Sequence, residues 1–371
     1  LAAETPQEQF NLIGAGRRNL IINGKCSVNQ RGTNTGANTV TGPDRFFIHS
    51  SNPSGHVIES SQQRDGPSGF DNCFQYKVTS AASSPAADQY TGFAQKFEVQ
   101  DIIPYIWSGA SHVTASFWVK SSIAGTFSFN INPEETNSGG SADRLLYAGT
   151  YTINSTNTWE YKTITIPLSF LNSYALLSGY PDTTTGLELT WVLDVISGSN
   201  RTNVSAGWNT PTEARNVVTS TSGDTGFFTT VNATFKITGI QFEVGKVATP
   251  FEHRSYGEEL ALCQRYYRQW GGNSGNERIA VGFYYTTSGF RTCIDLNPEM
   301  RTTPTLSVSS HSHFHTEYNG ASASNTAHGL DQASPRVAAV NVTTTRTASG
   351  GMAGQLMCNS TAARLKLDAE L

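Results

Sequence analysis

Three histidines at alternate positions, His311, His313 and His315, form the sharpest chemical pattern in the sequence. Alternate residues of a β-strand face the same side, so this spacing predicts three imidazoles on one strand face. Imidazole nitrogens are good zinc ligands, and two of them can grip a metal ion. The pattern indicates a structural metal site, although a solvated polar strand that is merely rich in histidine is the simpler interpretation. We expect no other cofactor.

Aromatic side chains next to turn signals form a second group. Aromatic rings stack on the apolar face of sugars, and amides or guanidinium groups add hydrogen bonds. Trp208 and Asn209 lie in a polar stretch that lacks strand alternation. A ring that covers the end of a sandwich or contacts another subunit is the alternative. The predicted ligand-binding residues are Trp208, Asn209, Arg201, Trp107, Tyr105 and Tyr180.

The remaining tryptophans follow strand or helix patterns. Trp191, Trp270 and Trp159 occupy positions typical of a buried core. Trp118 shares its strand parity with polar residues, but its segment, SFWVKSS, is typical of a framework strand. We therefore do not place these four residues in the binding site.

No arrangement of residues predicts catalysis. A glycosidase needs two carboxylates about the scissile bond, and no spacing in the sequence singles out a pair. The sequence also lacks a GxSxG elbow, an HExxH helix and a phosphate-binding glycine loop. We therefore expect a protein that is not an enzyme. The acidic residues available for such a pair include Asp44, Asp65, Asp71, Glu134, Glu135 and Glu243.

The elements that must position these side chains are mostly short strands. Residues 187–195 alternate apolar and polar side chains, and the same period recurs in 93–99 and 113–119, between turns rich in Gly, Pro and Asn. Such spacing predicts an all-β fold built on an antiparallel jelly-roll sandwich. In 235–244 the apolar parity shifts at Thr238 and Gly239, which predicts a β-bulge.

One helix is predicted over residues 255–270, where Leu260, Cys263 and Trp270 form an apolar stripe. Ser255 and Glu258 have the spacing of a capping box at its start. The predicted domains are an N-terminal segment (1–18), a jelly roll (19–254), a linking helix (255–271) and a smaller C-terminal β domain (272–371).

The composition excludes several classes of protein. The chain has 371 residues, 11% of them aromatic and 15% charged, with a formal net charge of −4. The aromatic content excludes disorder, and the balanced charge argues against nucleic-acid binding. No apolar run is long enough for membrane insertion. Five scattered cysteines without CxxC spacing predict reduced thiols and assembly in a cytoplasm, and the missing initiator Met predicts a piece of a longer chain.

Several segments occur in an order that is specific to one family. Residues 19–33 (NLIINGKCSVNQRGT), 44–48 (DRFFI) and 237–270 (ITGIQFEVGKVATPFEHRSYGEELALCQRYYRQW) resemble bacteriophage tail-fibre proteins, as do 298–306 (PEMRTTPTL) and the terminal LDAEL. The resemblance implies that residues 1–18 join an upstream shaft and that residues 19–254 form a jelly roll similar to carbohydrate-binding modules. A helix and a small distal β domain would follow. It covers residues 19–371, but the loops that would select a receptor are not matched.

The resemblance implies a virion protein of the tail fibre, assembled in the host bacterial cytoplasm. It would form a homotrimer, contact other tail proteins and adsorb to a glycan or protein of the host surface. Multivalent attachment would make a weak, shallow site on each chain sufficient. Two alternatives stay open, a head-decoration or collar protein and a depolymerase of surface polysaccharide. Depolymerising tailspikes usually show a repetitive β-helix, and this sequence has no repeat of fixed period.

Overall fold

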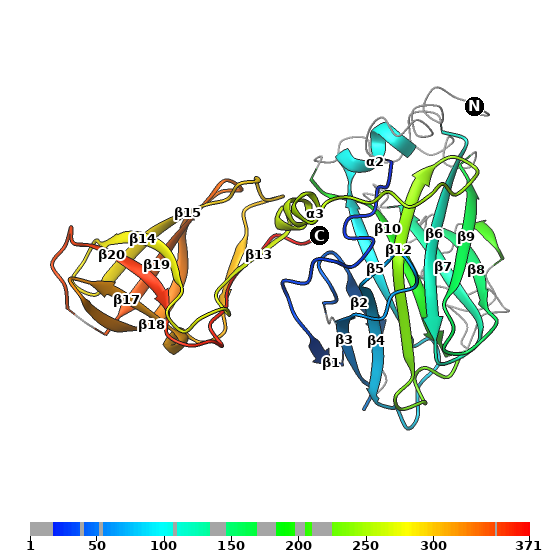
Figure 1. Cartoon of the computed structure of the whole chain (residues 1–371), viewed down its shortest axis with the longest axis horizontal. Helices are drawn as coiled ribbons and strands as arrows, with labels where there is room; N and C mark the ends of the chain where they lie inside the picture. The colour runs from blue at the N-terminus through cyan, green and yellow to red at the C-terminus, as the bar shows by residue number, and fades with distance from the viewer. Residues whose placement is uncertain are drawn as a thin grey trace. The chain divides into compact units, whose positions relative to one another are not determined.

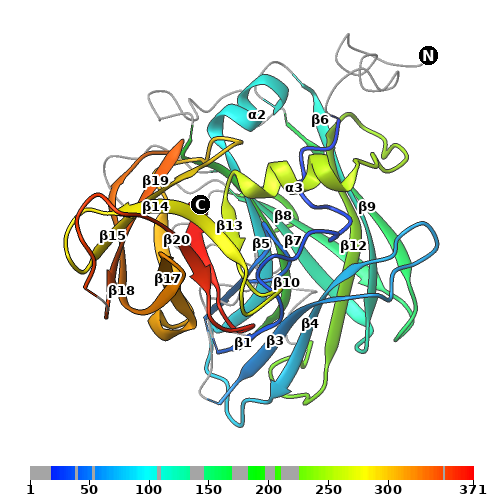
Figure 2. The ribbon, with the colours of Figure 1, turned by 60° about the vertical axis from the view of Figure 1, so that its left-hand side comes forward.

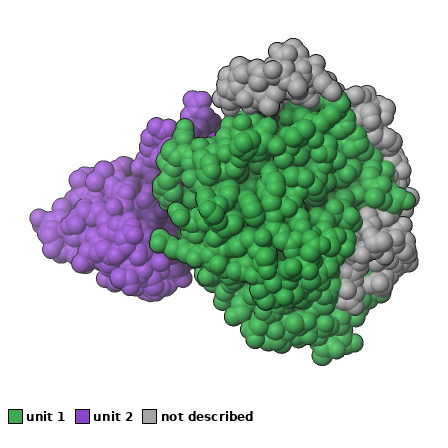
Figure 3. Space-filling view, turned by 45° about the vertical axis from the view of Figure 1, so that its right-hand side comes forward, with its two compact units in different colours: residues 1–259, 371 green, residues 260–370 purple. Residues whose placement is uncertain are grey.

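The computed structural model describes residues 18–37, 41–51, 55–106, 110–133, 146–168, 183–196, 205–209, 225–345 and 347–371, without the side chains of 103–106. The chain divides into two compact units (Figures 1 and 3). Unit 1 comprises residues 1–259 with residue 371, and unit 2 comprises residues 260–370. Among the described helices, none is both long and apolar enough to span a bilayer.

Unit 1 is a sandwich of two six-stranded antiparallel sheets, visible as two layers in Figure 2. The first, sheet A, has the order β1 (Asn34–Gly36), β3 (Val57–Gln63), β4 (Cys73–Ser80), β12 (Thr234–Val244), β6 (His112–Ser121) and β9 (Glu160–Pro167). The second, sheet B, has the order β11 (Gly207–Asn209), β8 (Leu146–Ile153), β7 (Gly125–Pro133), β10 (Thr185–Val195), β5 (Tyr90–Glu98) and β2 (Phe47–Ser51), and helix α2 (Val99–Ile106) follows β5. The all-β sandwich predicted from strand periodicity is confirmed.

The core of unit 1 lies between the two sheets and is rich in aromatic rings. Trp191 of β10 is fully buried, and its ring stacks on Phe93 of β5 with centroids 5.2 Å apart. Phe117 of β6 meets Trp191 edge to face from the opposite sheet, at 5.8 Å. Burial of these aromatic rings adds to the apolar area that holds the two sheets together.

The predicted β-bulge is confirmed in β12, where the register with β6 shifts between Thr238 and Gln241. Gly239 has a φ of +61°, and a Cβ at this position would lie 2.7 Å from the ring of Phe70. Only glycine avoids both the strained φ and this clash. The bulge reverses which residues of β12 face the core, so Ile237 before it and Phe242 after it are both buried.

The segments 19–33, 44–48 and 237–270 contact one another in unit 1. The side chain of Asn19 donates to the carbonyl of Ile240 at 3.0 Å and accepts from the amide of Phe242 at 3.0 Å. Asn23, in the left-handed region with a φ of 62°, donates to the carbonyl of Asp44 at 3.0 Å. Each segment thus satisfies buried backbone groups of another, which is a framework role.

Helix α3 (Tyr256–Gln264) begins at the predicted capping box. The amide of Ser255 donates to the Glu258 carboxylate at 2.8 Å, and the amide of Glu258 donates to the Ser255 hydroxyl at 3.3 Å. The helix is shorter than the predicted 255–270, because residues 267–270 form strand β13 (Tyr267–Trp270). Their backbone pairing with β21 (Leu365–Asp368) forms a strand in place of continued helix.

Unit 2 contains a three-stranded sheet and a closed barrel of six antiparallel strands. The sheet has the order β13, β21 and β16 (Thr305–Val308), and the short 3-10 helix η2 (His311–His313) follows β16. The barrel has the order β14 (Arg278–Tyr284), β15 (Gly289–Asp295), β19 (Val337–Thr344), β18 (Ala321–Ala333), β17 (Phe314–Tyr318) and β20 (Ala353–Cys358). Its core holds Tyr284, whose hydroxyl pairs with Thr316 at 2.8 Å. All five cysteines of the chain are free thiols, and only Cys293 is exposed.

Candidate functional site

The outer face of sheet A carries an aromatic and cationic surface, which we call the β6–β9 platform. Phe117 and Val119 of β6 point into the core. Trp118 lies between them and Lys120 follows Val119, so these two side chains point outward. Strand β9 places Tyr161 directly opposite Trp118. The platform consists of Trp118, Lys120, Trp159, Tyr161, Lys236 and Asp65.

The rings of the platform lie close enough together to act as one surface. Trp118 and Tyr161 have ring centroids 5.3 Å apart and a 47° angle between their planes. Tyr161 is 44% exposed, and Trp118 and Trp159 are half-buried. The indole N–H of Trp159 donates to the backbone carbonyl of Asp65 at 3.1 Å, which holds the ring in place. Aromatic rings fixed at a solvent-facing position are the usual means of binding an apolar sugar face.

Charged groups beside the rings are arranged as a triad. Lys120 and Lys236 face each other across β6 and β12, and Asp65 accepts from both ammonium groups, at 3.0 Å and 2.6 Å. The hydrogen bond from Lys236 holds the pKa of Asp65 below its usual range, and Lys120 adds to the effect. Lys120 also lies 5.8 Å from the centre of the Trp159 ring. The carboxylate thus offsets the repulsion of two neighbouring ammonium groups.

A second polar cluster lies on the outer face of sheet B, but it is largely closed to solvent. The carboxylate of Glu188 contacts Nδ1 of His49 at 3.1 Å and accepts from the hydroxyl of Thr190 at 2.9 Å. Both Glu188 and Thr190 are fully buried. Because only His49 of this cluster retains some exposure, the β6–β9 platform is the more accessible of the two polar surfaces.

The structure corrects the expected setting of Trp208. We expected an irregular loop, but Trp208 and Asn209 lie in β11, an edge strand that pairs with β8. Trp208 stands opposite the core residue Tyr147 and packs against its ring edge to face at 5.4 Å. Its indole N–H donates to the carbonyl of Pro167 at 2.6 Å. The ring therefore covers the sandwich edge, and its predicted role in binding stays a prediction.

The other predicted ligand-binding residues are only partly described. Tyr105 lies in the last turn of α2, and its side chain is not among the described ones. Trp107, Tyr180 and Arg201 lie outside the described residues. Asn209 donates to the carbonyls of Ser205 and Gly207, at 2.8 Å and 2.7 Å. Within the described part of this group, no cluster of rings and amides comparable with the platform is formed.

The structure also corrects the predicted histidine row. His311 and His313 lie in the 3-10 helix η2, where side chains do not alternate, and His315 is buried in β17. Among the described residues, no group of three or more His, Cys, Asp or Glu side chains is placed to hold a metal ion. Instead, His311 meets His328 of β18, and burial together with the nearby His311 lowers the pKa of His328 to about 4.

Three of the acidic residues considered for catalysis have structural partners. Asp44 accepts from the amide of Gln30 at 2.9 Å, and Glu243 accepts from the amide of Thr249 at 2.9 Å. Asp65 belongs to the platform triad. Glu134 and Glu135 lie outside the described residues.

Solved structures with a similar arrangement of strands are mainly carbohydrate-binding modules. A proposed sugar-binding protein from Bacteroides thetaiotaomicron is 14% identical, with 62% of this chain and 100% of that one covered at a TM-score of 0.34. The family 11 module of Lic26A-Cel5E from Clostridium thermocellum is 16% identical, with 59% and 98% covered at 0.28. The CBM22-1 xylan-binding domain of Xyn10C from Paenibacillus barcinonensis is 10% identical, with 63% and 100% covered at 0.27. No protein-family model and no curated protein matches the sequence.

At these low TM-scores the matches carry no functional conclusion for this chain. The sequence contained one signal for the platform, which the interpretation of SFWVKSS as a framework strand set aside. Trp118 shares strand parity with Thr114, Ser116 and Lys120, and a large ring among polar residues marks an outward position. Trp159 was expected in the core, whereas its ring is half-buried beside Lys120.

Proposed function

We propose that this chain is a non-enzymatic, receptor-binding part of a bacteriophage tail fibre that adsorbs to glycan on the surface of its bacterial host. The observation that carries the binding role is the β6–β9 platform, in which the exposed ring of Tyr161, two half-buried tryptophan rings and paired charges share one sheet face. The tail-fibre role rests on the resemblance of residues 19–33, 44–48 and 237–270 to tail-fibre proteins.

The chemistry of the platform suits a polysaccharide chain. The rings of Trp118 and Tyr161 offer an apolar surface to the C–H face of a pyranose. Lys120 and Lys236 donate hydrogen bonds, while Asp65 accepts them from hydroxyl groups. An open sheet face admits the middle of a long glycan as well as its end. Weak binding at each such site suffices when several copies engage the same cell.

We also propose that the chain acts as a homotrimer together with other tail proteins. Val281 and Phe283 of β14 and Tyr285 just after it are exposed large apolar side chains in unit 2, and Val281 is 79% exposed. Because alternate residues point the same way, Val281 and Phe283 lie on one strand face. A contiguous exposed apolar surface of this kind is typical of contacts between chains.

The binding role is tested with the labelled 371-residue chain and immobilised polysaccharides extracted from bacterial surfaces. Trp118→Ala and Tyr161→Ala should each weaken binding about tenfold, because each removes a ring worth roughly 1.4 kcal/mol. Tyr256→Ala is the matched control, since Tyr256 is also an exposed tyrosine of unit 1, at 56% against 44% for Tyr161, and lies on α3. Trp208→Ala tests the residue predicted from sequence. Unchanged binding by both platform variants would overturn the proposed site.

A further inference from the structure

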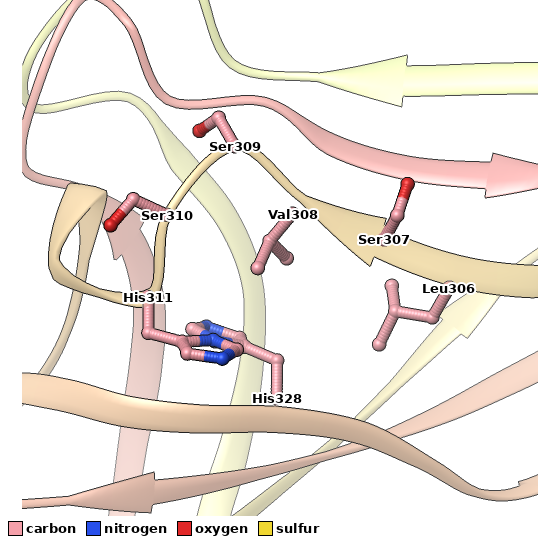
Figure 4. A pocket seen from close by; sticks show the side chains of 7 residues that line it. All are labelled: Leu306, Ser307, Val308, Ser309, Ser310, His311 and His328. Carbon is pink, nitrogen blue, oxygen red and sulfur yellow. The ribbon is translucent and has the colours of Figure 1, made fainter.

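Unit 2 contains a pair of histidines from two distant segments that meet at an open cavity. Nδ1 of His311 in η2 lies 2.9 Å from Nδ1 of His328 in β18. The rings are nearly parallel, with 13° between their planes and centroids 5.2 Å apart. Figure 4 shows the two rings meeting beneath Val308. The cavity has a volume of about 410 Å³ and is lined by Leu306, Ser307, Val308, Ser309, Ser310, His311 and His328.

The separation of the two nitrogens suits a shared metal ion. Zinc binds imidazole nitrogen at about 2.0–2.1 Å, and two such bonds at right or tetrahedral angles place their nitrogens about 2.9–3.4 Å apart. The observed 2.9 Å between the two Nδ1 atoms lies at the short end of this range. The two rings meet head-on, because the 5.2 Å between their centroids equals the 2.9 Å between the nitrogens plus the distance of each nitrogen from its ring centre. The two nitrogens converge on one metal ion only after the exposed His311 ring turns through a large angle, and water in the adjoining cavity would complete the coordination.

Asn325 is placed to orient the ring of His328 for metal binding. Its side-chain nitrogen lies 3.3 Å from Nε2 of His328, and its Oδ1 is buried without a hydrogen-bond partner. Turning the amide would bring Oδ1 to Nε2, where it accepts an N–H. Ring nitrogens that face away from a metal ion usually donate to such an oxygen, which directs the other nitrogen at the metal.

We propose that His311 and His328 bind one first-row transition-metal ion, of the class of Zn²⁺, Ni²⁺ or Cu²⁺, through their Nδ1 atoms, with Asn325 as a positioning residue. In the metal-free pair, the Asn325 amide donates to Nε2 of His328, so Nδ1–H of His328 donates to Nδ1 of His311. On binding, that proton moves to Nε2 of His328, and the turned amide accepts it. Both Nδ1 lone pairs then form bonds to the metal. No proton leaves the ring, and no oxidant is needed.

The proposal differs from the row of three histidines predicted from the sequence. His313 is turned to the hydroxyl of Ser309, with Nδ1 2.9 Å from Oγ, and His315 is buried in β17. The second ligand, His328, lies 17 residues beyond His311 and is brought beside it by the hairpin of β17 and β18. The site needs one chain only.

The test is calorimetric titration of the full chain with ZnCl₂ after removal of any histidine tag. We expect one saturable site per chain. His311→Ala and His328→Ala should each abolish it, and Asn325→Ala should weaken it by about 10–100-fold. His313→Ala is the matched control and should bind like the wild type. Circular dichroism of each variant separates loss of the site from loss of the fold.

Titration with Co²⁺ provides a second, spectroscopic measurement that does not rely on the heat of binding. Co²⁺ added to the wild type should give visible absorption bands that vanish in His328→Ala and persist in His313→Ala. The proposal is overturned if the wild type shows no saturable Zn²⁺ binding, or if binding survives unchanged in both His311→Ala and His328→Ala. It does not depend on glycan binding by unit 1.

Discussion

At the scale of single residues, Trp118 shows how strand parity controls which side chains are available for function. Its neighbours Phe117 and Val119 are buried in the sandwich, so Trp118 must face outward. The same alternation places Tyr161 beside it on β9. A tryptophan at such a position gains less from burial than one in the core, which is why it is a candidate for contact with a ligand.

A second residue, His56, should make unit 1 sensitive to acid. His56 is buried against the ring of Phe228, with centroids 5.0 Å apart, and burial lowers its pKa to about 4. In the unfolded chain His56 therefore binds a proton as the pH falls through about 6.5, whereas in the folded chain it stays neutral until about pH 4. The contribution of neutral His56 to the free energy of unfolding is fully present above about pH 6.5. It falls as the pH drops toward 4, and the loss is about 2–3 kcal/mol near pH 4.5. Denaturant unfolding at about pH 7 and pH 4.5 should show a smaller drop for His56→Phe. An equal drop in both proteins would contradict this account.

Gly239 provides a prediction about the bulge in β12. Gly239→Ala introduces a side chain at a positive φ and also places a Cβ against Phe70. Gly32→Ala is the matched control, since Gly32 has a φ of 72° but no atom within 4 Å of its Cβ position. We expect a loss of about 1 kcal/mol for the control and of about 2–4 kcal/mol for Gly239→Ala, measured by thermal unfolding. Equal losses would mean that the Phe70 contact adds nothing.

At the scale of elements, periodicity predicted the strands well but failed where two patterns overlap. Alternation in 187–195 correctly predicted β10, because both faces of that strand are determined by the sandwich. In 267–270 the spacing of Tyr267 and Trp270 suited a helix, but pairing with β21 made the segment a strand. That partner lies about a hundred residues away in the sequence, so no local pattern reveals it.

The candidate sites show the same limit. The histidines at 311, 313 and 315 alternate, but Ser310 and the turn of η2 break the strand that alternation assumes. The pairing of His311 with His328 depends on the hairpin of β17 and β18, and the platform depends on three strands of sheet A. Residue types were visible in the sequence, whereas their neighbours come from long-range pairing.

At the scale of the whole molecule, the low charge of the chain suits broad contacts with other chains or with glycans. Light scattering should give a mass of about 120 kDa for a trimer, three times the 40.1 kDa of one chain. Val281→Glu places a charge on the exposed β14 surface and should shift the protein toward monomer. Val247→Glu is the matched control, because Val247 is 74% exposed in unit 1. A monomeric wild type would contradict the trimer.

The most direct test of the central claim is adsorption of the labelled full chain to bacterial cells that bind the wild type. We predict that Trp118→Ala with Tyr161→Ala together reduce the bound fraction to the level of an unrelated protein, while Tyr256→Ala binds as the wild type does. Adding polysaccharide from the same cells should compete with the wild type for binding. Full adsorption by the double variant, or binding that the polysaccharide does not reduce, would contradict glycan recognition by the β6–β9 platform.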